Sequence, residues 1–167
     1  MRAVDAEVIT TRRLTLEPLA VHHAEEMAGV LADPGLHAFI GGAPQSAEGL
    51  RARYERLVAG SGQPGVSWCN WVVRLSSEDC LTGTVQATVA GAQAEIAWVV
   101  GTAWQGRGIA TEAARGLVGL LGSRGVTTVV AHIHPDHLAS AAVAAGAGLA
   151  ATDEWHDGEV RWRLTAG

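Results

Sequence analysis

The segment from residue 94 to residue 133 constrains the fold more than any other part of the chain. The apolar run AEIAWVVG (94–101) predicts a strand, GRGIATEAARGLVGLLGSRG (106–125) predicts a helix, and the β-branched run VTTVVAHI (126–133) predicts a second strand. Two strands that flank one helix are typically parallel and joined by a right-handed crossover. The segment therefore predicts a sheet that contains a parallel pair.

The residues before this segment predict an antiparallel part of the same sheet. WCNWVVRL (68–75) and CLTGTVQATV (80–89) are strand-like, and the short connections SSED and AGAQ join them to each other and to residues 94–101. Such short connections favour a meander of antiparallel strands.

The remaining segments add three strands and three helices. RRLTLEPL (12–19) alternates as a strand does, and DEWHDGEVRWRL (153–164) predicts a hairpin around its Asp-Gly pair. Apolar residues at helical spacing predict helices over 20–34, 46–60 and 136–148, with Ser46 and Asp136 as N-caps of the last two. We expect an α+β fold with a mixed, mostly antiparallel seven-stranded sheet and about four helices.

Length and composition narrow the class of protein. A chain of 167 residues favours a single domain over 1–167. A formal charge of −5 argues against nucleic-acid binding. The N-terminal stretch has no apolar signal region, and no apolar run approaches the ~20 residues that span a membrane, so we expect a cytoplasmic protein without a membrane partner. Cys69 and Cys80 are too sparse for a disulfide framework, and we expect two free thiols.

Two glycines mark the junction between the strand at 94–101 and the helix that follows. Gly106 and Gly108 lack Cβ atoms, so an anion can approach the backbone, and Arg107 between them adds a positive charge. Backbone N–H groups at the start of a helix suit phosphates. The pattern is neither G-x-G-x-x-G in a first βαβ unit nor a P-loop, and taken alone it also fits an ordinary tight turn.

The surroundings of these glycines resemble a known family. QGRGIA (105–110) resembles the Q/R-x-x-G-x-G/A acetyl-coenzyme A signature of GNAT N-acetyltransferases. AEIAWVV is similar to the fourth strand of that fold, and ATEAARGLVGLL to the helix that follows it. TTRRLTLEPL is similar to the first strand of the branch that includes ribosomal-protein N-terminal acetyltransferases. The resemblance covers nearly the whole chain and implies a three-layer α/β/α fold whose strands four and five splay apart.

The resemblance also implies how acetyl-CoA, the co-substrate, is held. The N–H groups from Gly106 to Thr111 would bind its pyrophosphate, and the backbone from Trp98 to Val100 would pair with its pantetheine arm. One N–H near Val99 or Val100 would serve as an oxyanion donor. The implied coenzyme-binding residues are Trp98, Val99, Val100, Gln105, Gly106, Arg107, Gly108, Ile109, Ala110, Thr111 and His137.

The stretch HIHPDH (132–137) admits two interpretations. Its spacing resembles the metal-binding signature of metallo-β-lactamases, which makes a zinc metallohydrolase an alternative. That class needs further ligands far downstream, and we expect no metal here. Under the GNAT resemblance, the stretch corresponds to an HPDNxxS pattern in which Asn contacts the coenzyme, and His137 replaces that Asn. His132 and His134 are then strand residues with satisfied hydrogen bonds.

The candidate catalytic residues are Glu95, Ser140 and His137. Glu95 interrupts an apolar strand, and burial there would raise its pKa towards the range of a general base. The alternative is that Glu95 is a solvated residue at the edge of the strand. Many family members carry a Tyr that protonates the leaving thiolate where this chain has Ala144, so Ser140 is the first substitute and His137 the second. Helical spacing places His137, Ser140 and Ala144 on one face.

The expected reaction is transfer of an acetyl group to a primary amine by direct attack on the thioester. The acceptor is a protein N-terminus, an antibiotic or a small metabolite, and Asn70 and Gln86 are candidates for polar contacts with it. The acidic surplus favours a cationic acceptor. A non-catalytic acyl-CoA-binding regulatory domain is the alternative, because Ala144 and His137 depart from the family pattern. The chain is expected to be a monomer or a homodimer.

Overall fold

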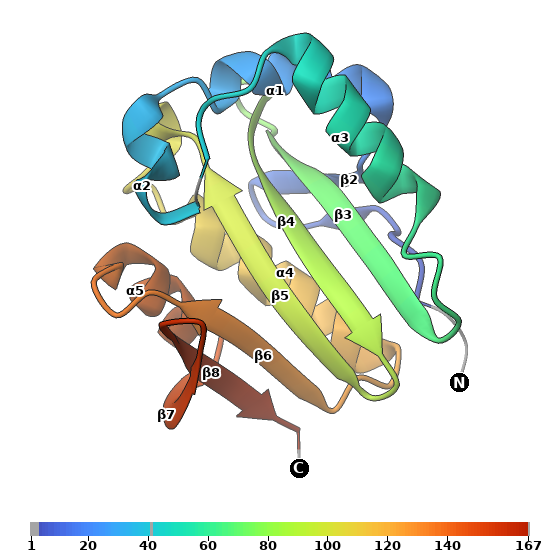
Figure 1. The fold of residues 1–167 in the computed structure, drawn as a ribbon, viewed down its shortest axis with the longest axis vertical. Helices are drawn as coiled ribbons and strands as arrows, with labels where there is room; N and C mark the ends of the chain where they lie inside the picture. Colours follow the sequence, from blue (N-terminus) through green and yellow to red (C-terminus); the bar gives the residue numbers. More distant parts are fainter. Residues whose placement is uncertain (1–3, 41, 167) are drawn as a thin grey trace.

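The computed structural model describes residues 4–40 and 42–166 and shows a mixed sheet of eight strands (Figure 1). The spatial order is β1-β2-β3-β4-β5-β6-β8-β7, and every neighbouring pair is antiparallel except β5 and β6. The predicted parallel pair and antiparallel meander are confirmed. The strands are β1 Ile9–Thr10, β2 Leu14–Pro18, β3 Val66–Leu75, β4 Cys80–Ala90, β5 Gln93–Val100, β6 Thr128–Ile133, β7 Ala150–His156 and β8 Glu159–Thr165.

The prediction of seven strands is one short, because β1 has only two residues. It pairs with β2 across a turn in which the Thr11 N–H donates to the Leu14 carbonyl. A two-residue strand is too short to produce an alternating pattern, so the sequence gives no sign of it. At the other end of the sheet, the hairpin turn at Asp157 and Gly158 is confirmed, with positive φ at both residues.

Helices cover both faces of the sheet, as the three-layer prediction requires (Figure 1). One buried cluster joins α1 and α3 to Val72 and Leu81, and another joins α4 and α5 to the opposite face of the sheet. The α-helices are α1 Ala24–Val30, α2 His37–Ile40, α3 Ala47–Ala59, α4 Ile109–Ser123 and α5 Leu138–Gly146, and the 3-10 helices are η1 Val21–His23, η2 Pro34–Leu36 and η3 Thr102–Trp104. Among the described residues, no helix is long and apolar enough to cross a membrane.

Strands β5 and β6 separate along their length. They are paired only from Gln93 to Glu95, after which β6 stays with β8 and β5 stays with β4. The expected splay is therefore confirmed. Gly83 of β4 permits the end of β5 to approach closely, because a Cβ there would lie 2.1 Å from the Val99 carbonyl oxygen.

The two predicted N-caps have different outcomes. Ser46 caps α3, and its Oγ accepts the Gly49 N–H at 3.1 Å. The Asp136 prediction is wrong, since His137 is the N-cap of α5. Residues 134–137 form a turn in which the Asp136 N–H donates to His134 Nδ1 at 3.0 Å, so the helix begins two residues later than predicted.

Candidate active site

The turn before α4 forms one wall of a cleft of about 620 Å³. The end of β5 and one side of α5 form the other walls. All the residues that the resemblance assigned to the coenzyme line this glycine-turn cleft, except Arg107. Whether they contact a coenzyme stays a prediction. Cys69 and Cys80 are both free thiols, as expected, and neither lines the cleft.

Both glycines of the turn adopt the left-handed conformation, with φ of +77° at Gly106 and +76° at Gly108, the N-cap of α4. Within the described chain, the N–H groups of residues 106–111 donate no hydrogen bond to a protein acceptor, and the Glu112 N–H is the first that does. A Cβ on Gly106 would meet no atom within 4 Å, so the space beside this backbone is open. An exposed run of N–H groups at a helix start is suited to phosphate.

Arg107 contributes less to this cradle than the sequence suggested. Its Nη2 lies 2.6 Å from Glu78 Oε2, so its charge is paired, and it does not line the cleft. Its carbonyl accepts a hydrogen bond from Arg13 Nη1 at 2.9 Å, and Arg13 in turn pairs with Glu112. These contacts fix the turn against β2 instead.

The backbone of β5 offers groups to the gap beside it. The Gly101 N–H donates to the Thr82 carbonyl at 2.8 Å. Since backbone N–H groups alternate in direction along an antiparallel pair, the Val99 N–H faces β4. The N–H groups of Trp98 and Val100 face away from β4, beyond the last residues that pair with β6. The oxyanion donor was predicted to be the N–H of Val99 or of Val100, and this alternation favours Val100.

A second pocket, of about 470 Å³, lies where β5 and β6 diverge. This splay pocket shares Trp98, Val99, His137 and Ser140 with the glycine-turn cleft. It also contains Glu95. Of the two alternatives for Glu95, the solvated one is confirmed, since its side chain is 56% exposed and lies on the face of β5 opposite the buried Ala94 and Ile96.

Glu95 is held by a neighbour that the sequence treated as structural. His132 Nδ1 lies 3.2 Å from Glu95 Oε1, and the imidazole is nearly buried. Its Nε2 accepts a hydrogen bond from Arg161 Nε at 3.1 Å, so Nδ1 carries the proton that faces the carboxylate. The prediction of satisfied hydrogen bonds for His132 is confirmed. The chain Arg161–His132–Glu95 fixes both the histidine tautomer and the direction of the carboxylate.

His137 and Ser140 lie together at the start of α5. Ser140 Oγ is 3.3 Å from His137 Nε2, and both residues line the cleft and the splay pocket. Burial, followed by the nearby charge of His134, lowers the pKa of His137 and favours the neutral imidazole. Ala144, one turn after Ser140 on α5, is fully buried in the core and does not line the cleft.

The zinc alternative finds no support in this geometry. Both ring nitrogens of His132 are engaged by Glu95 and Arg161. Across residues 4–40 and 42–166, no group of three His, Cys, Asp or Glu side chains is placed to hold a metal ion.

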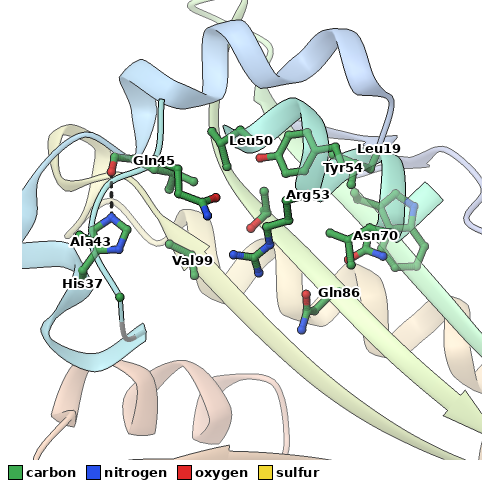
Figure 2. A pocket seen from close by; sticks show the side chains of 15 residues that line it. Leu19, His37, Ala43, Gln45, Leu50, Arg53, Tyr54, Asn70, Gln86 and Val99 are labelled. Carbon is green, nitrogen blue, oxygen red and sulfur yellow. Dashed lines mark hydrogen bonds between the residues drawn. The ribbon is translucent and has the colours of Figure 1, made fainter. Parts of the chain in front are cut away.

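A third pocket, of about 240 Å³, opens between α3 and the central strands (Figure 2). It shares Arg53, Thr84, Gln86 and Val99 with the splay pocket, so the three pockets form one groove that meets at Val99. Asn70 and Gln86 line it, as their predicted role requires. Arg53 and its neighbour Tyr54, both on α3, also line it, and no local pattern in the sequence marks either residue.

Comparisons with known proteins agree with this arrangement. Residues 13–150 match the family described as the acetyltransferase (GNAT) domain. No curated protein matches the chain significantly. Among solved structures, an acetyltransferase of the GNAT family from Bacillus anthracis is 18% identical, with 95% of this chain and 98% of that chain covered and a TM-score of 0.78.

Two further structures are similar over nearly the whole chain. RimL, a ribosomal L7/L12 α-N-protein acetyltransferase in complex with coenzyme A, is 18% identical, with coverage of 96% and 98% and a TM-score of 0.81. RimJ from Mycobacterium smegmatis, in complex with CoA-disulfide, is 17% identical, with coverage of 96% and 88% and a TM-score of 0.80. These likenesses show the same fold, and the family match extends over most of the chain. The chain belongs to the GNAT family of N-acetyltransferases.

Proposed function

We propose that this protein transfers the acetyl group of acetyl-CoA to a primary amine by direct attack on the thioester. One observation carries the proposal. The unpaired N–H groups of residues 106–111 and the Glu95 carboxylate, which His132 holds, line the same groove, on either side of the gap between β5 and β6. The first suits the anionic end of the coenzyme, and the second suits proton removal from an amine.

The coenzyme would lie along the glycine-turn cleft. The N–H groups of residues 106–111 hold its pyrophosphate, and the free edge of β5 pairs with its pantetheine arm as an added strand would. The Val100 N–H then faces the thioester carbonyl oxygen. Loss of one such donor costs about 3 kcal/mol of activation free energy in acyl-transfer enzymes.

The amine would enter from the splay pocket. Glu95 removes its proton, directly or through a water, and the nitrogen attacks the carbonyl carbon. His132 and Arg161 keep the carboxylate in position during this step. The C–S bond then breaks, and the thiolate takes a proton from the Ser140 hydroxyl, which is held by His137 and is reprotonated by the second proton that the acylated nitrogen releases. A neutral His137 beside the hydroxyl is consistent with its lowered pKa.

The acceptor is a protein N-terminus, an antibiotic or a small metabolite amine. The likeness to RimL supports the first of these, at the level of fold. Ala144 gives the alternative its specific basis, since a buried alanine supplies no proton and a regulatory acyl-CoA-binding domain needs none.

Thiol release with acetyl-CoA, measured over a panel of amines, tests the proposal. We expect release that depends on the amine, with an acetylated product found by mass spectrometry. Tight coenzyme A binding without thiol release for any amine would favour the regulatory domain.

A further inference from the structure

The pocket between α3 and the central strands contains an arginine without a partner. Arg53 forms no ion pair or hydrogen bond with the described residues, although it lines both this pocket and the splay pocket. Figure 2 shows its guanidinium among the side chains that line the pocket, which include Gln86 and Asn70. Arg107 and Arg161, by contrast, form ion pairs with Glu78 and Glu154.

A second polar group in the same pocket also lacks a partner. Tyr54 is only 4% exposed, and its hydroxyl has no hydrogen-bond partner within the described chain. Burial raises the pKa of Tyr54, so the hydroxyl remains protonated and can donate. Buried hydroxyls are normally hydrogen-bonded, but this oxygen is itself covered by protein atoms and is closed to a ligand, so Arg53 is the donor that the pocket offers.

The acidic residues of the groove lie in the splay pocket and not in the pocket that holds Arg53. The lining of the Arg53 pocket includes no Asp or Glu among the described residues, whereas the splay pocket contains Glu95, Asp157 and Glu159. The two pockets are continuous through Arg53, Thr84, Gln86 and Val99, so one small molecule or chain end reaches both. A volume of about 240 Å³ suits a group no larger than an amino-acid side chain.

We propose that Arg53 binds a carboxylate carried by the acetyl acceptor, a few bonds from the amine that reacts beside Glu95. The inference rests on the proposed function and names its substrate class. The acidic surplus of the sequence favoured a cationic acceptor, but overall charge says little about one pocket. A guanidinium binds a carboxylate through charge-assisted hydrogen bonds.

Pairs of acceptors that differ in a single carboxylate test whether the protein prefers an acidic acceptor. One pair is serine and serine amide, which differ at the α-carboxylate. The other is two C-terminally amidated tetrapeptides that begin Ser-Glu and Ser-Gln and differ at one side chain. Thiol release gives kcat/KM, and calorimetry on protein loaded with coenzyme A gives acceptor affinity. We expect the acid of at least one pair to be preferred about 10- to 100-fold, the usual range for a charged hydrogen bond. The preferred pair shows whether the carboxylate belongs to a free amino acid or to a chain end.

Substitutions on α3 show which residue produces the preference for the acidic acceptor. Arg53→Gln should remove the preference and leave coenzyme A affinity unchanged. Arg51→Gln is the matched control, since Arg51 lies on the same helix, is exposed and lines none of the three pockets. Tyr54→Phe should leave the preference unchanged with no loss of thermal stability, because it removes a covered, unsatisfied hydroxyl that a ligand does not reach.

Two outcomes would overturn the inference: equal use and equal binding of acid and amide in both pairs, or a preference that survives Arg53→Gln. Absence of thiol release with every acceptor would instead contradict the proposed function. Acid-selective binding that depends on Arg53 would still support the carboxylate site in that case.

Discussion

The two ends of the groove are built from different parts of the chain. The coenzyme end uses backbone groups from two adjacent segments, the end of β5 and the turn before α4. The acceptor end uses side chains from distant segments, among them Arg53, Gln86, Glu95 and His132. A backbone cradle tolerates many side chains but depends on its glycines. A pocket built from side chains depends on individual residues instead. Substitutions at the coenzyme end should therefore reduce coenzyme binding, whereas substitutions at the acceptor end should reduce turnover or acceptor binding.

The largest effect is expected from Gly108→Glu at the coenzyme end. Gly108 has a φ of +76°, which strains any other residue, and a carboxylate there would stand against the pyrophosphate. Coenzyme A binding should be lost in calorimetry, while circular dichroism shows an intact fold. Gly119→Ala is the control, because a Cβ there meets nothing within 4 Å. Retained affinity in Gly108→Glu would refute the phosphate assignment.

Glu95→Gln should have the next largest effect and should spare the coenzyme end. Loss of a general base lowers kcat about 10²- to 10⁴-fold. Coenzyme A affinity should not change. Asp157→Asn is the matched control, since this carboxylate lines the same pocket but is 88% exposed, and it should lose little activity. Equal losses in both variants would mean that Glu95 is not the base.

Gly83→Ala tests the boundary between the two ends. The added Cβ would lie 2.1 Å from the Val99 carbonyl oxygen, so the end of β5 has to move. Displacement of reacting groups by about 1 Å costs about 100-fold in rate. We expect such a loss in kcat, with weaker coenzyme binding. Steady-state kinetics with wild-type values would show that the geometry of β5 does not matter to the reaction.

His137→Asn should have the smallest effect, because Asn is usual at this position in the family that the chain resembles. Its clearest readout is the dependence of stability on pH. The pKa of His137 is lowered in the folded state, so protonation favours the unfolded chain and stability falls as pH drops below about 6.5. Urea unfolding at pH 7.5 and pH 5 should show a smaller loss for the variant than for the wild type. A larger loss would contradict the assignment of a neutral imidazole.

The same contrast explains what could be predicted from the sequence. The glycine turn and the crossover are local patterns, and the fold confirms both. The residues assigned to the coenzyme line one cleft, and their contact with a coenzyme stays a prediction. The acceptor end was predicted only in part. The apolar neighbours of Glu95 could not decide whether it is buried or solvated, and His132 appeared merely structural because its partner Arg161 lies 29 residues further along the chain. Arg53 was missed because an exposed arginine on a helix carries no local signal.

The most direct test of the account is a crystal structure of the protein with acetyl-CoA. It should show the pyrophosphate on the N–H groups of residues 106–111, the pantetheine arm between β5 and β6, and the thioester oxygen beside the Val100 N–H. The sulfur should lie near Ser140, with Glu95 on the acceptor side of the carbonyl carbon. A coenzyme bound outside the gap between β5 and β6 would contradict the account.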